Sequence, residues 1–209
     1  MGEINIKDSI KKEKDWVGNR KSTFVTLGAS NHTDRERAEY DLYCTSPSAI
    51  DALANVGKLP KNKNVWECAA GLLHLSNRLR DYGYSVISTD LIDRGTCEGG
   101  IDFLETKELR APCILTNPPY KYCLEFVEHA VHTLQCDEYY GFHKLTFLES
   151  VKRRAFFDKY PPAEVLVFSK RINVATNGDP EMFEKSSAAC YAWFIWRKGI
   201  YEAPKVGWI

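Results

Sequence analysis

Apolar and polar residues follow two different periods along the chain, and the two kinds of segment alternate from about residue 46 onward. Short apolar runs typical of buried strands lie at 64–68, 84–89, 113–116, 141–147, 165–168 and 190–196. Segments with apolar residues at helical spacing lie at 46–54, 72–82, 121–134 and 150–159. Strands that alternate with helices of this size predict an α/β fold with a mainly parallel sheet, covered by helices on both faces.

The remaining segments set the domain boundaries. Residues 1–39 are polar and lack a sustained hydrophobic period, which predicts a partly flexible arm, whereas 40–209 is predicted to form a single domain. Residues 172–187 form an extended irregular segment with a turn at 177–180. No apolar run approaches the roughly 18 residues that cross a bilayer, and the amino terminus lacks the apolar core of a secretory signal. We therefore expect a cytoplasmic protein.

Charge adds one local feature to this picture. The chain carries 28 basic and 28 acidic side chains, so its net charge of zero gives no general attraction to a polyanion. Basic residues are in excess between 143 and 171. Two interpretations of this strip stay open, a solvated helix face and a contact surface for nucleic-acid phosphates. The candidate phosphate contacts are Lys152, Arg153, Arg154, Lys170 and Arg171.

Cysteine and histidine residues do not predict a metal site. The seven cysteines include no C-x-x-C pair, which is typical of buried apolar residues and free thiols. His129 and His132 lie three residues apart on a predicted helix without a third ligand in view, so a packed or solvated pair is favoured. We expect no bound metal.

Ligands of open α/β sheets bind beyond the carboxyl ends of the strands, near the point where the strand order reverses. After the first predicted strand, Glu67 is followed by the small residues Ala69 and Gly71, which let a ligand approach the backbone. Asp90 ends the second strand about twenty residues later, where an acid accepts hydrogen bonds from ribose hydroxyls. Tight packing and helix capping explain the same residues without a ligand. Together they favour an adenosine-containing cofactor, either a nicotinamide dinucleotide or S-adenosylmethionine.

Asn117, Pro118, Pro119 and Tyr120, here called the NPPY turn, directly follow the apolar strand at 113–116. The two prolines fix the backbone and remove two N–H donors, so the turn presents acceptors. A ring-conjugated amine is a poor nucleophile because its lone pair is delocalised. The Asn117 side-chain oxygen and the Pro118 carbonyl would accept its two N–H groups and localise that lone pair, while the Tyr120 ring would stack on a flat base. The NPPY turn therefore predicts methyl transfer to a planar amine, with S-adenosylmethionine as the cofactor.

On these residues the chain resembles the class I S-adenosylmethionine-dependent amino-methyltransferases, and within them the small DNA adenine-N6 methyltransferase-like proteins of phages and prophages. The resemblance spans about residues 28–209, and its most specific segments are 88–95, 100–104, 116–120, 144–149 and 207–209. It implies a Rossmann-like methyltransferase fold with a seven-stranded sheet whose last strand is antiparallel. It also implies that Asp90 binds the cofactor ribose, that Asp102 and Phe103 border the adenine, and that Thr45 contacts the methionine carboxylate.

The same resemblance implies adenine in double-stranded DNA as the substrate, flipped out of the helix into the site, and the host cytoplasm as the location of a phage-encoded member. RNA adenine and a protein glutamine amide stay open as targets, because each presents a planar amine to the NPPY turn. The family motif has a glycine where this chain has Leu73. We expect the leucine side chain to crowd the methionine end of the cofactor, so a catalytically silent module that binds nucleic acid or blocks a host enzyme also stays open.

Overall fold

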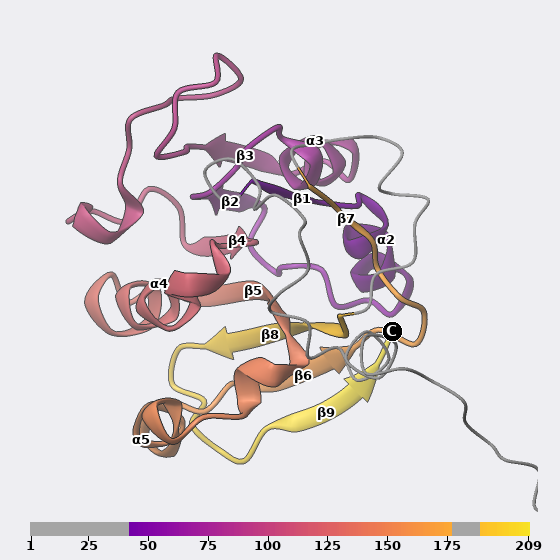
Figure 1. Cartoon of the computed structure of the whole chain (residues 1–209), viewed down its shortest axis with the longest axis vertical. Helices are drawn as coiled ribbons and strands as arrows, with labels where there is room; N and C mark the ends of the chain where they lie inside the picture. The colour runs from indigo at the N-terminus through magenta and orange to yellow at the C-terminus, as the bar shows by residue number, and fades with distance from the viewer. Residues whose placement is uncertain (1–41, 177–188) are drawn as a thin grey trace, which may run out of the picture. The chain divides into compact units, whose positions relative to one another are not determined.

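The computed structural model describes residues 42–176 and 189–209 (Figure 1). The predicted arm at 1–39 and the predicted turn at 177–180 lie outside the described residues. Within the described ranges, strands and helices alternate as the periodicity predicts. No helix in these ranges is long and apolar enough to span a membrane.

Seven strands form one sheet in the order β3-β2-β4-β5-β8-β6-β9. In chain order they are β2 (Asn64–Glu67), β3 (Ser85–Ser88), β4 (Cys113–Thr116), β5 (Glu138–Lys144), β6 (Glu164–Val167), β8 (Tyr191–Arg197) and β9 (Lys205–Trp208). All neighbouring pairs are parallel except the two pairs that include β8, which is antiparallel to both β5 and β6. The mainly parallel, seven-stranded sheet with an antiparallel strand is therefore confirmed.

Alternate side chains of the strands enter two apolar layers, one on each face of the sheet. Trp66 and Ile114 belong to one layer, and their chain neighbours Val65, Cys113 and Leu115 belong to the other; all are fully buried. The helices are α2 (Ser48–Asn55), α3 (His74–Asp81), α4 (Cys123–Glu128) and α5 (Val151–Lys159). Apolar residues of α2 and α3 join the layer of Val65, whereas those of α4 and α5 join the layer of Trp66, so helices cover both faces as predicted.

A second, two-stranded sheet consists of β1 (Tyr43–Thr45) and β7 (Val174–Thr176), which pair in antiparallel fashion. The sequence predicts an irregular segment over 172–187. This prediction is wrong for 174–176, because these three residues form a strand that pairs with β1. The remainder of that segment, 177–187, lies outside the described residues. The pair anchors the chain that leads into α2.

Three further elements differ from the sequence prediction because long-range contacts outweigh local pattern. The strand predicted at 141–147 begins at Glu138, whose buried carboxylate accepts the Lys61 N–H at 3.0 Å, and it gives way to a 3-10 turn at Leu145–Leu148. The helix predicted at 121–134 is divided into a 3-10 turn (Tyr120–Tyr122), α4 and a wider π-type turn (His129–Thr133). No local pattern indicates β9, which follows the antiparallel strand and pairs with β6.

The strand order reverses between β2 and β4. From β2 the chain passes to β3 on one side, then crosses to β4 on the other side of β2. Connections leave in opposite directions from the carboxyl ends of these two strands, which opens a crevice between them. Glu67 is the last residue of β2 and the NPPY turn follows β4, so both lie where their strands end at this crevice.

Candidate active site

A cavity of about 550 Å³ lies at the reversal point. This volume is within the range of roughly 300–1,000 Å³ that is usual for small-molecule sites. Five segments and two aromatic residues line it: 42–45, 67–72 with 74–75, 90–92 with Arg94, 101–105, 117–119, Tyr122 and Phe126. The predicted cofactor residues all belong to this lining, namely Thr45, Glu67, Ala69, Gly71, Asp90, Asp102 and Phe103. Three members of the NPPY turn, Asn117, Pro118 and Pro119, lie in the same wall.

Asn117 is held in one orientation by the neighbouring strand β1. Its Nδ2 donates to the Tyr43 carbonyl at 2.9 Å and to the Thr45 hydroxyl at 2.9 Å. The opposite rotamer would place the amide oxygen against the Tyr43 carbonyl oxygen, so the contact fixes which end of the amide is nitrogen. The Asn117 Oδ1 is buried without a hydrogen-bond partner in the described part of the chain. A free acceptor therefore remains in the wall of the cavity.

Thr45 acts through Asn117 in this arrangement. Its side chain is 2% exposed, and its hydroxyl accepts one of the two Asn117 donors. The Thr45 hydroxyl can still donate its own hydrogen, so the contact with the methionine carboxylate that the resemblance implies stays a prediction. Sequence reasoning missed Tyr43, whose carbonyl takes the second donor, because a backbone acceptor 74 residues before its donor leaves no sequence signal.

The rest of the NPPY turn departs from prediction in two details. The Pro119 carbonyl is not an outward acceptor, because it accepts the Tyr122 N–H at 2.8 Å. Tyr120 does not line the cavity: its hydroxyl shares a hydrogen bond with that of Tyr191 at 2.8 Å, and the Lys144 ammonium lies 4.4 Å from its ring centre. Tyr122, 40% exposed, lies in the cavity wall, as does Tyr43. The cavity wall thus contains the aromatic residue two positions after Tyr120, which the sequence marks only as a second aromatic after the turn.

Two carboxyl groups face the cavity from the ends of β2 and β3, in different electrostatic settings. Burial raises the pKa of Glu67 to about 8, although a hydrogen bond from the Ser76 hydroxyl acts in the opposite direction. Asp90 accepts hydrogen bonds from the Gly71 N–H at 2.8 Å and the Ile92 N–H at 2.9 Å. Glu67 is thus largely protonated at neutral pH, whereas Asp90 is surrounded by donors that suit a carboxylate.

The loop between β2 and α3 contains two left-handed backbone positions. Gly71 has φ +51°, a conformation that glycine adopts without cost, and Leu73 has φ +65° and ψ +18°. The prediction that the Leu73 side chain crowds the cofactor is wrong, because Leu73 is outside the cavity lining while Leu72 and His74 are part of it. The left-handed backbone conformation at Leu73, which glycine would adopt without strain, costs leucine about 1–2 kcal/mol of folding free energy.

Asp102 and Phe103, which the resemblance assigns to the cofactor adenine, are neighbours in the cavity lining. Asp102 accepts the Leu104 N–H at 2.9 Å and caps the short 3-10 turn Phe103–Glu105. The Phe103 ring is 2% exposed and packs edge-on against Trp66, with 5.3 Å between ring centres. His129 closes this cluster: its ring lies 5.0 Å from that of Phe103, so His129 has a packing role, while His132 contacts Tyr160 instead.

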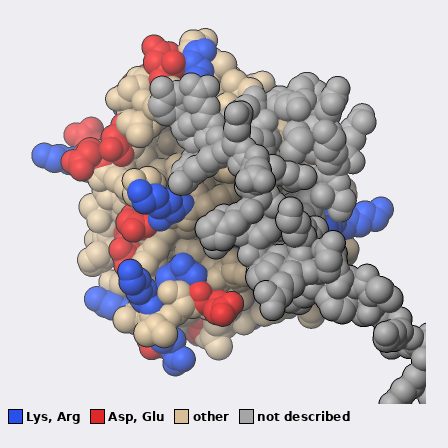
Figure 2. Space-filling view, viewed as in Figure 1, with Lys and Arg blue, Asp and Glu red and all other residues tan. Residues whose placement is uncertain are grey.

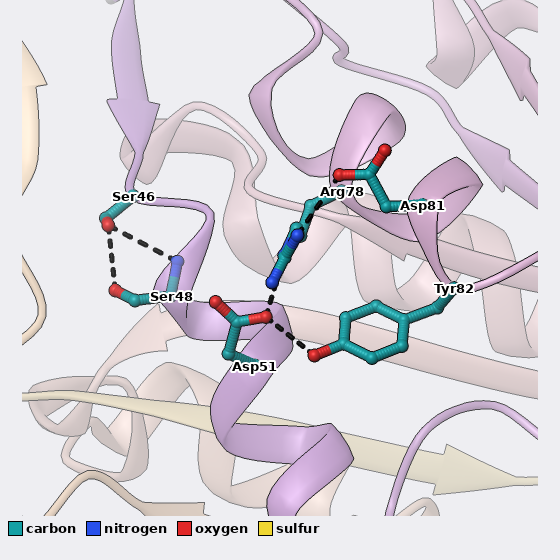
Figure 3. A network of polar contacts seen from close by, with 6 residues as sticks. All are labelled: Ser46, Ser48, Asp51, Arg78, Asp81 and Tyr82. Carbon is teal, nitrogen blue, oxygen red and sulfur yellow. Dashed lines mark hydrogen bonds and ion pairs between the residues drawn. The ribbon is translucent and has the colours of Figure 1, made fainter.

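A polar network connects α2 to α3 beside the cavity (Figure 3). Asp51 Oδ1 on α2 accepts from Arg78 Nε at 2.7 Å and from the Tyr82 hydroxyl at 2.8 Å. Ser46 Oγ accepts the Ser48 N–H at 3.3 Å at the start of α2. The bonds of Asp51 hold α2 against α3, the helix that follows Glu67, whereas the Ser46 bond is local to the start of α2.

The predicted phosphate contacts differ in their surroundings. Arg153 donates to the carbonyls of Phe147 at 2.6 Å and Thr146 at 3.0 Å, so its guanidinium holds the turn after β5. Arg154 is exposed and pairs with Asp158 at 2.7 Å. The other three, Lys152, Lys170 and Arg171, are exposed. On the face seen in Figure 2, Lys and Arg side chains gather where Figure 1 places α5, with acidic residues among them.

Comparison with known proteins gives the fold. No protein-family model and no curated protein matches the sequence. Among solved structures, the chain is similar to a candidate RNA methyltransferase of Pyrococcus horikoshii, at 17% identity and a TM-score of 0.54 over 88% of this chain and 100% of that one. The 23S rRNA methyltransferase ErmE has 16% identity and a TM-score of 0.47 over 70% of this chain and 65% of that one. A dimethyladenosine transferase of Plasmodium falciparum has 14% identity and a TM-score of 0.48 over 75% of this chain and 62% of that one. Both TM-scores are too low to support an argument about the fold. The chain has a Rossmann-like methyltransferase fold.

Proposed function

We propose that the protein is an S-adenosylmethionine-dependent methyltransferase that acts on N6 of adenine in nucleic acid, with DNA as the substrate that the family resemblance implies. The observation that carries the proposal is the Asn117 Oδ1, a buried acceptor without a partner among the described residues, on a side chain that lines the cavity and is held by β1. A buried polar atom without a partner is costly, so such an atom in a cavity wall is typical of a ligand contact.

The cavity suits the cofactor in volume and in chemistry. S-adenosylmethionine supplies an electrophilic methyl group on a sulfonium. Asp90 would accept from the ribose, Asp102 and Phe103 would border the adenine ring, and Glu67 would lie toward the cationic end once it is ionised. Gly71, with φ +51°, lets the backbone approach the ligand closely.

The chain's own residues then prepare the amine. Asn117 Oδ1 would accept one N–H of the target amine and the Pro118 carbonyl would accept the other, which turns the nitrogen lone pair out of conjugation. Tyr122 would stack on the flipped base, because its ring lies in the cavity wall and is 40% exposed. After methyl transfer the amine carries an extra proton, and Asn117 Oδ1 holds that proton until it passes to water. No strong base is required, because the methylated amine is a strong acid at this stage.

RNA is the second candidate substrate. The NPPY turn would bind the amine of adenine in the same way in DNA and in RNA. The Pyrococcus horikoshii protein of similar fold is described as a candidate RNA methyltransferase. A protein glutamine amide uses the same acceptors and stays a third possibility. Lys152, Lys170 and Arg171 would contact phosphates of either nucleic acid.

One experiment separates these targets. Labelled S-adenosylmethionine is incubated with the protein and with double-stranded DNA, single-stranded DNA, RNA or a protein extract, and the products are digested and analysed. Labelled N6-methyladenine from DNA supports the proposal, and the same base from RNA supports the second candidate. Label in glutamine, or no transfer to any acceptor while the cofactor binds, would contradict the adenine assignment.

A further inference from the structure

Asp90 is the acid that an adenosine cofactor needs, yet most of its acceptor positions are occupied. Its Oδ2 accepts the Gly71 N–H at 2.8 Å, whereas Oδ1 accepts both the Ile92 N–H and the Arg94 guanidinium at 2.9 Å. A carboxylate offers about four lone-pair positions, shared equally between its oxygens. Among the described residues, Oδ2 therefore keeps one free position and Oδ1 keeps none.

We infer that Arg94 is a specificity-determining residue that competes with the cofactor ribose for Asp90, an inference that rests on the proposed function. Two neighbouring ribose hydroxyls bind a carboxylate by donating one hydrogen bond to each oxygen. The Gly71 and Ile92 donors belong to the backbone and stay in place with the chain. Arg94 contributes the one donor that a side-chain rotation removes, so Arg94 must leave Oδ1 before the second hydroxyl can bind.

Removing Arg94 from Asp90 has a real cost. The two side chains are only 16% and 12% exposed, so solvent and salt screen this pair less than a surface pair. A charge-assisted hydrogen bond is roughly twice as strong as a neutral one, and the ribose hydroxyl that replaces it carries no charge. Arg94 also lines the cavity, so its released guanidinium must be accommodated beside the ligand or in water. Arg94 therefore lowers the affinity of the site for any ligand with a ribose diol.

The first test measures cofactor affinity by calorimetry without any methyl acceptor. Arg94→Met removes the competing donor and keeps an unbranched side chain, and we expect it to bind S-adenosylmethionine about tenfold more tightly than the wild type. Arg94→Gln serves as a second variant, with a smaller gain in the same direction. Arg110→Met is the matched control, because Arg110 pairs with Glu98 at the surface and lies outside the cavity lining. Its affinity should equal that of the wild type.

The second test asks whether the gain comes from the ribose. Adenosine and 2′-deoxyadenosine are titrated into the wild type and Arg94→Met. A single hydroxyl can use the free position on Oδ2, so 2′-deoxyadenosine should bind both proteins alike. Adenosine should bind about tenfold more tightly to Arg94→Met, which makes the benefit of the 2′-hydroxyl depend on residue 94.

The outcomes separate this inference from the proposed function. Equal cofactor affinity in the wild type and both Arg94 variants would overturn the competition while leaving the proposed function intact. Weaker binding by folded Arg94 variants would show that Arg94 holds the ligand, which also overturns it. A gain that is equal for adenosine and 2′-deoxyadenosine would assign the effect to cavity volume and not to Asp90. No binding of S-adenosylmethionine to any of these proteins would reject the proposed function together with the inference.

Discussion

Glu67→Gln should change the way folding stability depends on pH. The Glu67 carboxyl is 2% exposed, and burial raises its pKa from 4.5 to about 8 in the folded protein. The unfolded chain keeps the ordinary value, so between pH 4.5 and about 8 the folded state holds a proton that the unfolded state has lost. In this window each pH unit lowers the free energy of unfolding by about 1.4 kcal/mol. Over the whole window the wild type loses on the order of 4–5 kcal/mol from this one group.

The direction of this pH dependence distinguishes the wild type from Glu67→Gln. The contribution of protonated Glu67 is complete below pH 4.5 and is lost as the pH rises to about 8. The amide introduced by Glu67→Gln stays uncharged at every pH and keeps an oxygen for the Ser76 hydroxyl. We expect the two proteins to differ by less than about 1 kcal/mol at pH 5, and the variant to be more stable by several kcal/mol at pH 9.

Urea unfolding followed by circular dichroism between pH 5 and pH 9 measures this difference. Subtracting the wild-type curve from the variant curve cancels the titration of all groups that the two proteins share. Glu108→Gln is the matched control, because Glu108 is exposed and lies outside the cavity. A constant difference between Glu67→Gln and the wild type across this pH range would refute a protonated, buried Glu67.

Two other predictions concern single side chains, and a third concerns the basic strip. The variant Leu73→Gly should be more stable than Leu73→Ala by about 1 kcal/mol or more, because both lose the leucine packing but only glycine removes the cost of the left-handed φ of +65°. Thermal unfolding of both variants measures this difference. A Leu73→Ala protein as stable as Leu73→Gly, or more stable, would contradict the prediction. Arg153→Met should lower the free energy of unfolding in urea by about 1–3 kcal/mol through the carbonyls it leaves unpaired. The double variant Lys152→Gln/Lys170→Gln should keep wild-type stability, because both side chains are exposed, and should reduce the log–log salt slope of nucleic-acid binding by roughly 1.5; an unchanged slope would exclude these two lysines as phosphate contacts.

Local sequence patterns predict the strands whose carboxyl ends border the cavity. The strand Cys113–Thr116 coincides with its prediction, because four apolar or β-branched residues stand between a proline and the NPPY turn. Glu67 ends β2 and Asp90 follows β3 as expected, because parallel strands bring their carboxyl ends to one edge of the sheet. The predicted cofactor residues therefore meet in one cavity.

Contacts between distant segments could not be predicted in the same way. The orientation of Asn117 depends on Tyr43 and Thr45, more than 70 residues earlier, and one of those acceptors is a backbone carbonyl. Arg153 reads as part of a basic run, although its donors turn inward to carbonyls of the preceding turn. Leu73 reads as an obstacle to the cofactor because sequence gives the residue type and not the direction of the side chain.

The central claim is that Asn117 Oδ1 holds the target amine, and Asn117→Ala tests it most directly. Calorimetry with S-adenosylmethionine and labelled methyl transfer to the preferred nucleic acid are measured on the wild type, on Asn117→Ala and on the control Asn55→Ala, which changes an exposed asparagine outside the cavity. We predict that all three proteins bind the cofactor and that only Asn117→Ala loses transfer, by about 100-fold or more, since a lost charge-stabilising acceptor costs about 3–4 kcal/mol in the transition state. Transfer by Asn117→Ala at the wild-type rate would contradict the claim.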